Sequence, residues 1–314
     1  MVEMKYCFGV DIGGTSVKLG LFQIDGQLID KWEIPTRKEN EGEKILPDIT
    51  SSLMKKLEER RVEKEHVIGI GVGVPAPVTR AGIVRATANL GWGYKEVKRE
   101  LEELTGLEVQ VGNDANVAAL GEMWKGGGLG YKNLVMVTLG TGVGGGVILN
   151  GNILTGVNRA GGEIGHICVN YNEEDKCGCG KTGCLEQYAS ATGKVSLAKK
   201  KLENETRKTM LNAEFISAKK IWDAVKEQDE VAMEIAEEFG AYLGHAIANF
   251  TVVLDPDVVV IGGGVSRAGI ILIDYIQKYY DEKAFFSNKN LKFVLAELGN
   301  DAGIYGAAKL AIDG

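Results

Sequence analysis

The distribution of glycine limits the folds open to this chain. The sequence has 43 glycines and only 5 prolines, and many of the glycines form clusters beside apolar runs. The clusters are neither periodic nor mixed with proline and serine, so they fit neither collagen nor a disordered segment. Glycine allows positive φ angles and close backbone approach. We therefore expect a backbone shaped around a ligand, with loops at residues 13–14, 126–128, 140–146, 161–162 and 262–264.

Two stretches share one pattern of strand, glycine loop and strand. They cover residues 6–22 and 133–151. The turn signals Asp25-Gly26 and Asn150-Gly151 stand at their ends, and such pairs favour two-residue hairpin turns. Two hairpins of one design, each beginning a half of the chain, suggest an internal duplication. The alternative is chance similarity between two glycine-rich hairpins.

Apolar periodicity elsewhere predicts helices and strands in alternation, which is typical of α/β layers. We expect the halves to divide near residues 112–116. The predicted first lobe is residues 1–114, joined by a returning C-terminal helix at 302–314, and the second is residues 115–301. The expected helices cover residues 45–57, 95–104, 116–124, 186–200, 218–253, 270–279 and 302–312, and the expected strands cover 67–74, 109–111, 257–261 and 291–295.

Composition excludes several classes of protein. The net charge of −7 argues against a nucleic-acid partner, because phosphate backbones need an excess of lysine and arginine. No apolar run approaches the roughly 18–20 residues of a membrane span, and the acidic, strand-like start is not that of a signal peptide. Five cysteines, three of them within residues 177–184, suit a metal or thiol cluster in a reducing compartment. We therefore expect a cytoplasmic protein.

The glycine loops suggest a nucleotide site, because free backbone N–H groups at such turns can bind phosphate oxygens. Asp11 could hold a Mg²⁺-bound water, and the hydroxyls of Thr15 and Thr141 could bond phosphate. The pattern is not that of a P-loop, and a strand rather than a helix follows residues 140–145, so the Rossmann interpretation fails. The nucleotide-binding candidates are Asp11, Gly13, Gly14, Thr15, Lys18, Gly140, Thr141, Gly142, Gly262, Gly263 and Gly264.

Asn113 and Asp114 follow a predicted strand, where α/β folds place ligands. Asp114 has two interpretations: it is the N-cap of the next helix, or it is a general base that accepts the proton of an attacking sugar hydroxyl. In the second case Asn113 would bond a neighbouring hydroxyl. Asn89, in the polar loop ending at Trp92, either contacts the sugar or belongs to a plain turn.

His166, Cys177, Cys179 and Cys184 form a Cys₃His set suited to tetrahedral zinc, with Cys168 as a fallback ligand. Four protein ligands leave no open position, so the metal would be structural. It would position Glu163 and Glu186, which flank the cluster, as hydrogen-bond acceptors facing the ligand. The alternatives are buried free cysteines and solvated surface glutamates.

Taken together, these motifs resemble the ROK family of sugar kinases and repressors, within the actin-like ATPase-domain sugar kinases, over nearly the whole chain. The cysteine run with its preceding Gly-His is specific to that family, whereas the glycine loops occur in the wider superfamily. The resembling segments are Asp11-Ile12-Gly13-Gly14-Thr15, Asn113-Asp114-Ala115-Asn116, Leu139-Gly140-Thr141-Gly142, Gly162-Glu163-Ile164-Gly165-His166, residues 177–186 and Gly262-Gly263-Gly264.

The resemblance implies an α/β, two-lobed actin-like (ribonuclease H-like) fold whose interlobe cleft closes on ATP-Mg²⁺ and a hexose. It makes Asp114 the catalytic base of glucose phosphorylation to glucose 6-phosphate. It implies sugar contacts from Asn89, Asn113, Glu163, His166 and Glu186, and zinc held by His166, Cys177, Cys179 and Cys184. It also favours a homo-oligomer, either a dimer or a tetramer.

The same family resemblance leaves other activities open. N-acetylmannosamine and other hexoses are alternative substrates, and polyphosphate is an alternative donor. A non-catalytic sugar sensor is a further alternative. The family's repressors carry an additional N-terminal helix-turn-helix, for which residues 1–10 leave no room.

Overall fold

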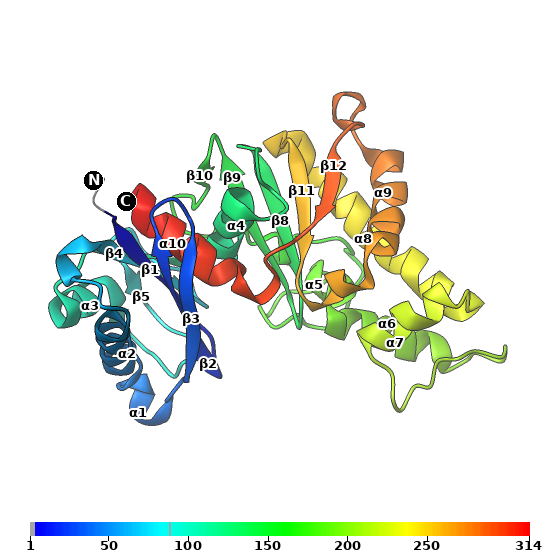
Figure 1. The fold of residues 1–314 in the computed structure, drawn as a ribbon. Coiled ribbons are helices and arrows are strands. Elements are labelled where there is room, and N and C mark those ends of the chain that lie inside the picture. The colour runs from blue at the N-terminus through cyan, green and yellow to red at the C-terminus, as the bar shows by residue number, and fades with distance from the viewer. Residues whose placement is uncertain (1–3, 88) are drawn as a thin grey trace. The chain divides into compact units, whose positions relative to one another are not determined.

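The chain forms two α/β units, each built on a five-stranded sheet (Figure 1). The computed structural model describes residues 4–87 and 89–314. Unit 1 comprises Met1–Gly130, Ile153–Gly161 and Glu297–Gly314, and unit 2 comprises Tyr131–Asn152 and Gly162–Ala296. The first boundary therefore falls after residue 130 and not after residue 114, because the helix that follows Asn113 packs within unit 1.

The sheet of unit 1 joins an antiparallel hairpin to parallel strands. β1 (Tyr6–Ile12) is central, pairing antiparallel with β2 (Ser16–Gln23) and parallel with β4 (Val67–Val74). β3 (Leu28–Pro35) and β7 (Val109–Asn113) form the edges. The carboxyl ends of β1, β4 and β7 therefore meet at one edge of the sheet.

Helices cover both faces of this sheet, because successive side chains of a strand point to opposite faces and both sets are apolar. The side chains of Phe8 and Val10 share an apolar core with α2 (Ile45–Arg60) and α3 (Val97–Thr105). On the opposite face, Cys7 packs with α10 (Ala302–Asp313). The smaller elements of this unit are α1 (Glu39–Gly42), β5 (Ile83–Val84) and β6 (Lys95–Glu96).

The C-terminal helix α10 lies in close backbone contact with its neighbours. A Cβ atom added at Gly9 or Gly71 of the sheet would collide with backbone carbonyl oxygens of α10. On its other side, a Cβ at Gly306 would collide with the backbone of α4 (Asp114–Lys125). Glycine is needed at these three positions because no side chain fits between the layers.

Glu122 of α4 is fully buried, which is unusual for a glutamate. Its carboxylate accepts hydrogen bonds from the backbone N–H groups of Gly127 (2.9 Å), Glu297 (3.0 Å) and Leu298 (2.9 Å). These bonds compensate for the loss of solvation. They also tie together the two places where the chain leaves and re-enters unit 1.

The sheet of unit 2 has the same strand order as that of unit 1. β8 (Leu134–Leu139) is central, between β9 (Val143–Leu149) and the parallel β11 (Val258–Gly262). β10 (Asn152–Ile153) and β12 (Lys292–Leu295) lie at the edges. Across the sheet the order is β3-β2-β1-β4-β7 in unit 1 and β10-β9-β8-β11-β12 in unit 2. When the five strands of each sheet are numbered along the chain, both orders read 3-2-1-4-5, so the repeat suggested by the two glycine hairpins is present in the topology.

Helices of unit 2 pack on β8 and β11 through one large apolar core. The predicted helix at 218–253 is two helices, because Gln228 has a positive φ of 60° and Asp229 caps the second one. Ser190 likewise breaks the helix expected at 186–200 by capping its second part. The helices are α5 (Glu186–Ala189), α6 (Ala191–Leu202), α7 (Ala218–Lys226), α8 (Glu230–Leu254) and α9 (Ile270–Lys283).

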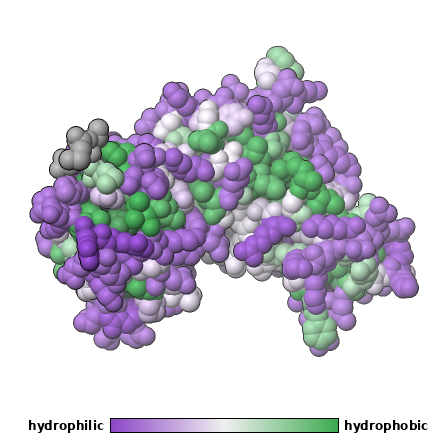
Figure 2. Space-filling view, in the orientation of Figure 1, coloured by the Kyte–Doolittle hydropathy of each residue, from purple (hydrophilic) through white to green (hydrophobic). Residues whose placement is uncertain are grey.

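The surface is mainly hydrophilic on the face drawn in Figure 2. Among residues 4–87 and 89–314, no helix combines the length and the apolar character that crossing a membrane requires.

Candidate active site and metal centre

The first glycine loop, Gly13–Thr15, connects β1 and β2, with Asp11 in the strand before it. A Cβ at Gly303, near the start of α10, would lie 2.5 Å from the carboxylate of Asp11. Burial raises the pKa of the Asp11 carboxyl above its ordinary value, and the nearby Lys18 ammonium offsets only part of this rise. Lys18 stands directly opposite Asp11 in the hairpin, and its Nζ donates to the carbonyl of Asn300 at 3.0 Å.

Asn113 and Asp114 lie at the junction of β7 and α4. Asn113, and not Asp114, is the N-cap: its Oδ1 accepts from the N–H of Asn116 at 3.1 Å. Its Nδ2 donates to Asp114 Oδ1 at 3.1 Å and to the carbonyl of Ala76 at 3.4 Å. Asp114 is thus the first helical residue, a half-buried carboxylate positioned by its neighbour.

The remaining candidates of unit 1 lie near the same edge of the sheet. A Cβ at Gly73 would lie 3.7 Å from both Asp11 Oδ1 and the Cα of Asp114. One at Gly14 would lie 3.3 Å from the carbonyl oxygen of Asn89. Unit 1 therefore gathers the first loop, Asn89 and the Asn113–Asp114 pair in one region.

The second glycine loop, Gly140–Gly142, connects β8 and β9 in unit 2. Glu186 Oε2 accepts a hydrogen bond from the N–H of Val143 at 3.0 Å. Its carboxylate lies so close to Gly142 that a Cβ there would collide with it. This carboxylate therefore helps to fix the loop.

The start of α6 holds the other side of the second loop. The carbonyl of Gly140 accepts from the N–H of Ala191 at 2.8 Å, and the carbonyl of Thr141 accepts from the hydroxyl of Thr192 at 3.1 Å. Sequence reasoning missed this support. The N-cap signal of Ser190, before an apolar run, could have indicated it.

The four predicted zinc ligands lie together. One ligand atom from each of His166, Cys177, Cys179 and Cys184 lies within 4.8 Å of the others. The Cys179 and Cys184 sulfurs are 3.6 Å apart, and Cys177 Sγ is 3.8 Å from His166 Nδ1. A tetrahedral site with Zn–S bonds of about 2.3 Å separates its ligand atoms by roughly 3.8 Å, so the donor set fits zinc in both chemistry and spacing.

The cluster is linked to the second loop through one side chain. Cys177 Sγ lies 3.6 Å from Glu186 Oε1, while Glu186 Oε2 bonds to the strand after the loop. The exposed Glu163 precedes the short 3-10 helix Ile164–His166. Its segment packs on β9, because a Cβ at Gly145 would lie 2.5 Å from the carbonyl of Gly162.

The third glycine cluster, Gly262–Gly264, also lies beside the second loop. A Cβ at Gly263 would lie 2.5 Å from the carbonyl oxygen of Leu139, the residue before the loop. Unit 2 therefore gathers the second loop, the third cluster, Glu186 and the zinc ligands. The candidate residues form two groups, one in each unit.

Known proteins resemble this chain along nearly its whole length. The sequence pattern of the ROK family matches residues 7–314. A glucokinase of Halalkalibacterium halodurans is 43% identical over 98% of this chain and 94% of its own length. A putative xylose repressor of a Caldicellulosiruptor species is 30% identical over 97% of this chain but only 77% of its own length.

Solved structures agree with these sequence comparisons. A ROK-family glucokinase of Streptomyces griseus, solved in complex with glucose and AMPPNP, covers 98% of this chain and all of its own, with 31% identity and a TM-score of 0.77. The predicted α/β, actin-like two-lobed fold is thereby confirmed. The chain belongs to the ROK family.

Proposed function

We propose that this protein transfers the γ-phosphoryl group of ATP to the 6-hydroxyl of glucose. The 43% identity to a glucokinase over 98% of the chain supports this assignment. The observation that carries it is the placement of Asp114 at the carboxyl end of β7, where the Asn113 side chain contacts its carboxylate. That is where a general base for a bound sugar hydroxyl is expected in an α/β fold.

In the proposed reaction, Asp114 accepts the proton of the 6-hydroxyl as its oxygen attacks the γ-phosphorus. The phosphorus–oxygen bond to ADP breaks, and glucose 6-phosphate and ADP leave. Asn89, Asn113, Glu163, His166 and Glu186 would orient the sugar. The first and second loops, Lys18 and the third glycine cluster would hold the nucleotide, and Asp11 would help to place Mg²⁺.

Zinc belongs to the proposal as a structural ion held by His166, Cys177, Cys179 and Cys184. It would fix the cysteine segment from which Glu186 reaches the second loop. We also propose a cytoplasmic homo-oligomer without a nucleic-acid partner. Light scattering in solution tests the oligomeric state.

A coupled assay that detects ADP tests the reaction. Purified protein is supplied with Mg²⁺, ATP and one of a panel of sugars that includes glucose, mannose and N-acetylmannosamine. We expect the highest kcat/KM with glucose. Binding of glucose without turnover would support a sugar sensor instead, and turnover with polyphosphate but not ATP would correct the donor.

A further inference from the structure

A cavity of about 1100 Å³ opens in unit 1 between two loops. One wall is residues 77–80 with Arg85 and Ala86, which flank β5, and the other is the 153–159 segment after β9 and the edge strand β10. Every residue that lines it belongs to unit 1. Its volume is slightly above the range of about 300–1,000 Å³ that is typical of small-molecule sites.

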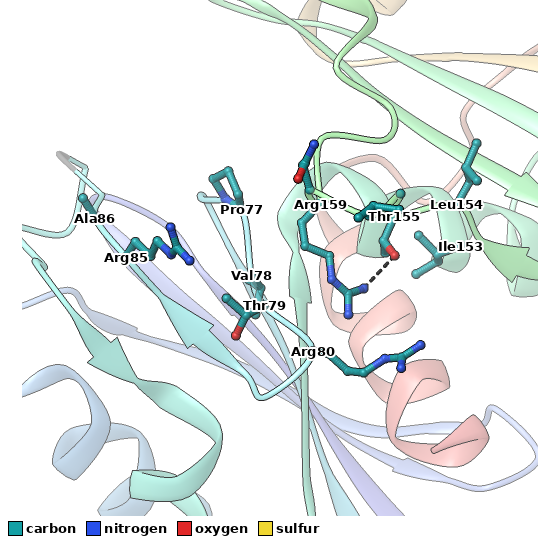
Figure 3. A pocket seen from close by; sticks show the side chains of 13 residues that line it. Pro77, Val78, Thr79, Arg80, Arg85, Ala86, Ile153, Leu154, Thr155 and Arg159 are labelled. Carbon is teal, nitrogen blue, oxygen red and sulfur yellow. Dashed lines mark hydrogen bonds between the residues drawn. The ribbon is translucent and has the colours of Figure 1, made fainter.

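Three arginines line this cavity: Arg80, Arg85 and Arg159. They come from separate parts of the lining, with Arg80 and Arg85 on the loop around β5 and Arg159 on the opposite segment (Figure 3). The lining contains no aspartate or glutamate. Arginine stays protonated at any physiological pH, so the cavity carries a positive charge that its own walls do not balance.

Three other arginines of the same unit are paired with carboxylates. Arg37, Arg60 and Arg99 each form an ion pair with a carboxylate. Within residues 4–87 and 89–314, no ion pair to a carboxylate is found for the three arginines of the cavity. Arg159 donates to the hydroxyl of Thr155 at 2.6 Å, which holds the guanidinium in place without neutralising it.

The substrates of the proposed reaction do not account for this charge. Glucose is neutral and needs no guanidinium groups. The proposed phosphate-binding loops, Gly13–Thr15 and Gly140–Gly142, do not line the cavity. Guanidinium groups bind phosphate through paired, charge-assisted hydrogen bonds. The unbalanced charge therefore points to a further anionic ligand.

Two residues of the cavity wall are direct neighbours in sequence of residues whose hydrogen bonds hold the segment around Asn113 and Asp114. Pro77 directly follows Ala76, whose carbonyl accepts from the Nδ2 of Asn113 at 3.4 Å. Ala86 directly precedes Thr87, whose hydroxyl donates to the carbonyl of Pro75 at 3.3 Å. A ligand in the cavity would therefore contact residues next to the backbone that holds Asn113.

We propose that this cavity is a binding site for a small organic phosphate that is neither substrate of the kinase reaction. The distinction between this ligand and the two substrates rests on the proposed function, whereas the binding of an anion does not. Three guanidinium groups around one space favour a ligand with more than one phosphate group.

Isothermal titration calorimetry tests the site, with fructose 1,6-bisphosphate as the organic phosphate. Inorganic phosphate and citrate serve as separate arms, and all titrations are matched in ionic strength. Saturating glucose and AMPPNP are present, so that the proposed substrate sites are filled. We expect one bisphosphate per chain, bound at least tenfold more tightly than inorganic phosphate or citrate.

The double variant Arg80→Gln/Arg85→Gln should weaken bisphosphate binding at least tenfold. Arg61→Gln is the matched control, because Arg61 is an exposed arginine of the same unit outside the cavity. Equal binding by wild type and double variant would overturn the site, and equal binding of citrate would overturn its preference for phosphate. Because calorimetry needs no turnover, failure of the kinase assay would leave the binding result intact.

Discussion

In both units a carboxylate packs against a glycine near a glycine loop, but the two carboxylates are held differently. In unit 1, Asp11 stands in the strand that leads into its own loop and packs against Gly303 of α10. In unit 2, Glu186 is 43 positions from Val143, the residue to which it bonds, and lies beside the cysteine cluster. The first arrangement depends on backbone packing, whereas the second depends on residues that would bind a metal.

The two units therefore position their candidate residues in different ways. The region in unit 1 needs close contact between helix and sheet, which glycines provide. The region in unit 2 needs four ligand atoms to converge, which an ion would stabilise. A change that affects the positioning of residues in one unit should therefore spare those in the other.

The largest effect is expected from Asp114→Asn in unit 1. The amide cannot accept the proton, so kcat should fall by roughly 10²–10⁴-fold with little change in glucose affinity. Steady-state kinetics and calorimetry with glucose measure both quantities. Asp274→Asn, an exposed change on α9, is the control. Near-normal turnover of the Asp114 variant would remove this carboxylate from the mechanism.

Removal of the metal should affect only the candidate residues of unit 2. We expect zinc-free protein, prepared with a chelator and then transferred to chelator-free buffer with Mg²⁺, to show a higher KM for glucose, because Glu186 and His166 lose their fixed positions. Anion binding by the arginine cavity should be unchanged. Metal analysis should find one zinc per chain. Cys179→Ser should abolish it and Cys168→Ser should not, since both thiols are exposed but only Cys179 belongs to the cluster. Full zinc content in Cys179→Ser would contradict the ligand set.

A single methyl group can test the contact between Glu186 and the second loop. Gly142→Ala should lower the free energy of unfolding by about 1–3 kcal/mol, because the Glu186 carboxylate must move away from the new Cβ and leave the N–H of Val143 without its acceptor. Gly140→Ala is the stability control, since a Cβ there has no atom within 4 Å. Chemical denaturation compares the two variants. If they are equally stable, the contact does not constrain the loop.

The smallest effect concerns Lys194, which is fully buried in α6 of unit 2. Its Nζ lies 4.2 Å from the ring centre of Trp222 and 3.7 Å from that of Phe239. Burial lowers the pKa of this ammonium well below its usual range. The unfolded chain therefore binds the proton more tightly, so stability should rise with pH between the lowered pKa and the ordinary value near 10.4.

Lys194→Met should remove that pH dependence. It should also stabilise the protein at neutral pH by about 1 kcal/mol, because the methionine fills the space without a polar atom. Denaturation at pH 7 and pH 9.5 measures the difference. Parallel pH profiles for wild type and variant would show that the lysine keeps its proton between the rings.

Local signals in the sequence predicted much of the fold. The Asn150-Gly151 pair forms the expected turn, with φ angles of 53° and 79°. The cysteine cluster was predictable from ligand type, and its four members do converge. In both cases the deciding chemistry lies in the residue types themselves, a turn-forming pair of neighbours and a donor set suited to zinc.

What the sequence could not predict depends on contacts between distant segments. A glutamate on a helix is ordinarily solvated, and only the three N–H groups that reach Glu122 explain its burial. The arginine cavity joins loops more than sixty residues apart, so no local pattern indicates it. The roles of individual residues in binding sugar and nucleotide remain predictions.

The position of α10 also bears on how the protein is made. This helix follows the other described helices and strands along the chain, so it leaves the ribosome after them, yet the first sheet packs directly against its backbone. Unit 2 ends at Ala296 and has all its strands and helices before α10 is synthesised. Most of unit 1 is translated before unit 2, but its core is complete only after α10 has been made. Unit 2 can complete its core earlier.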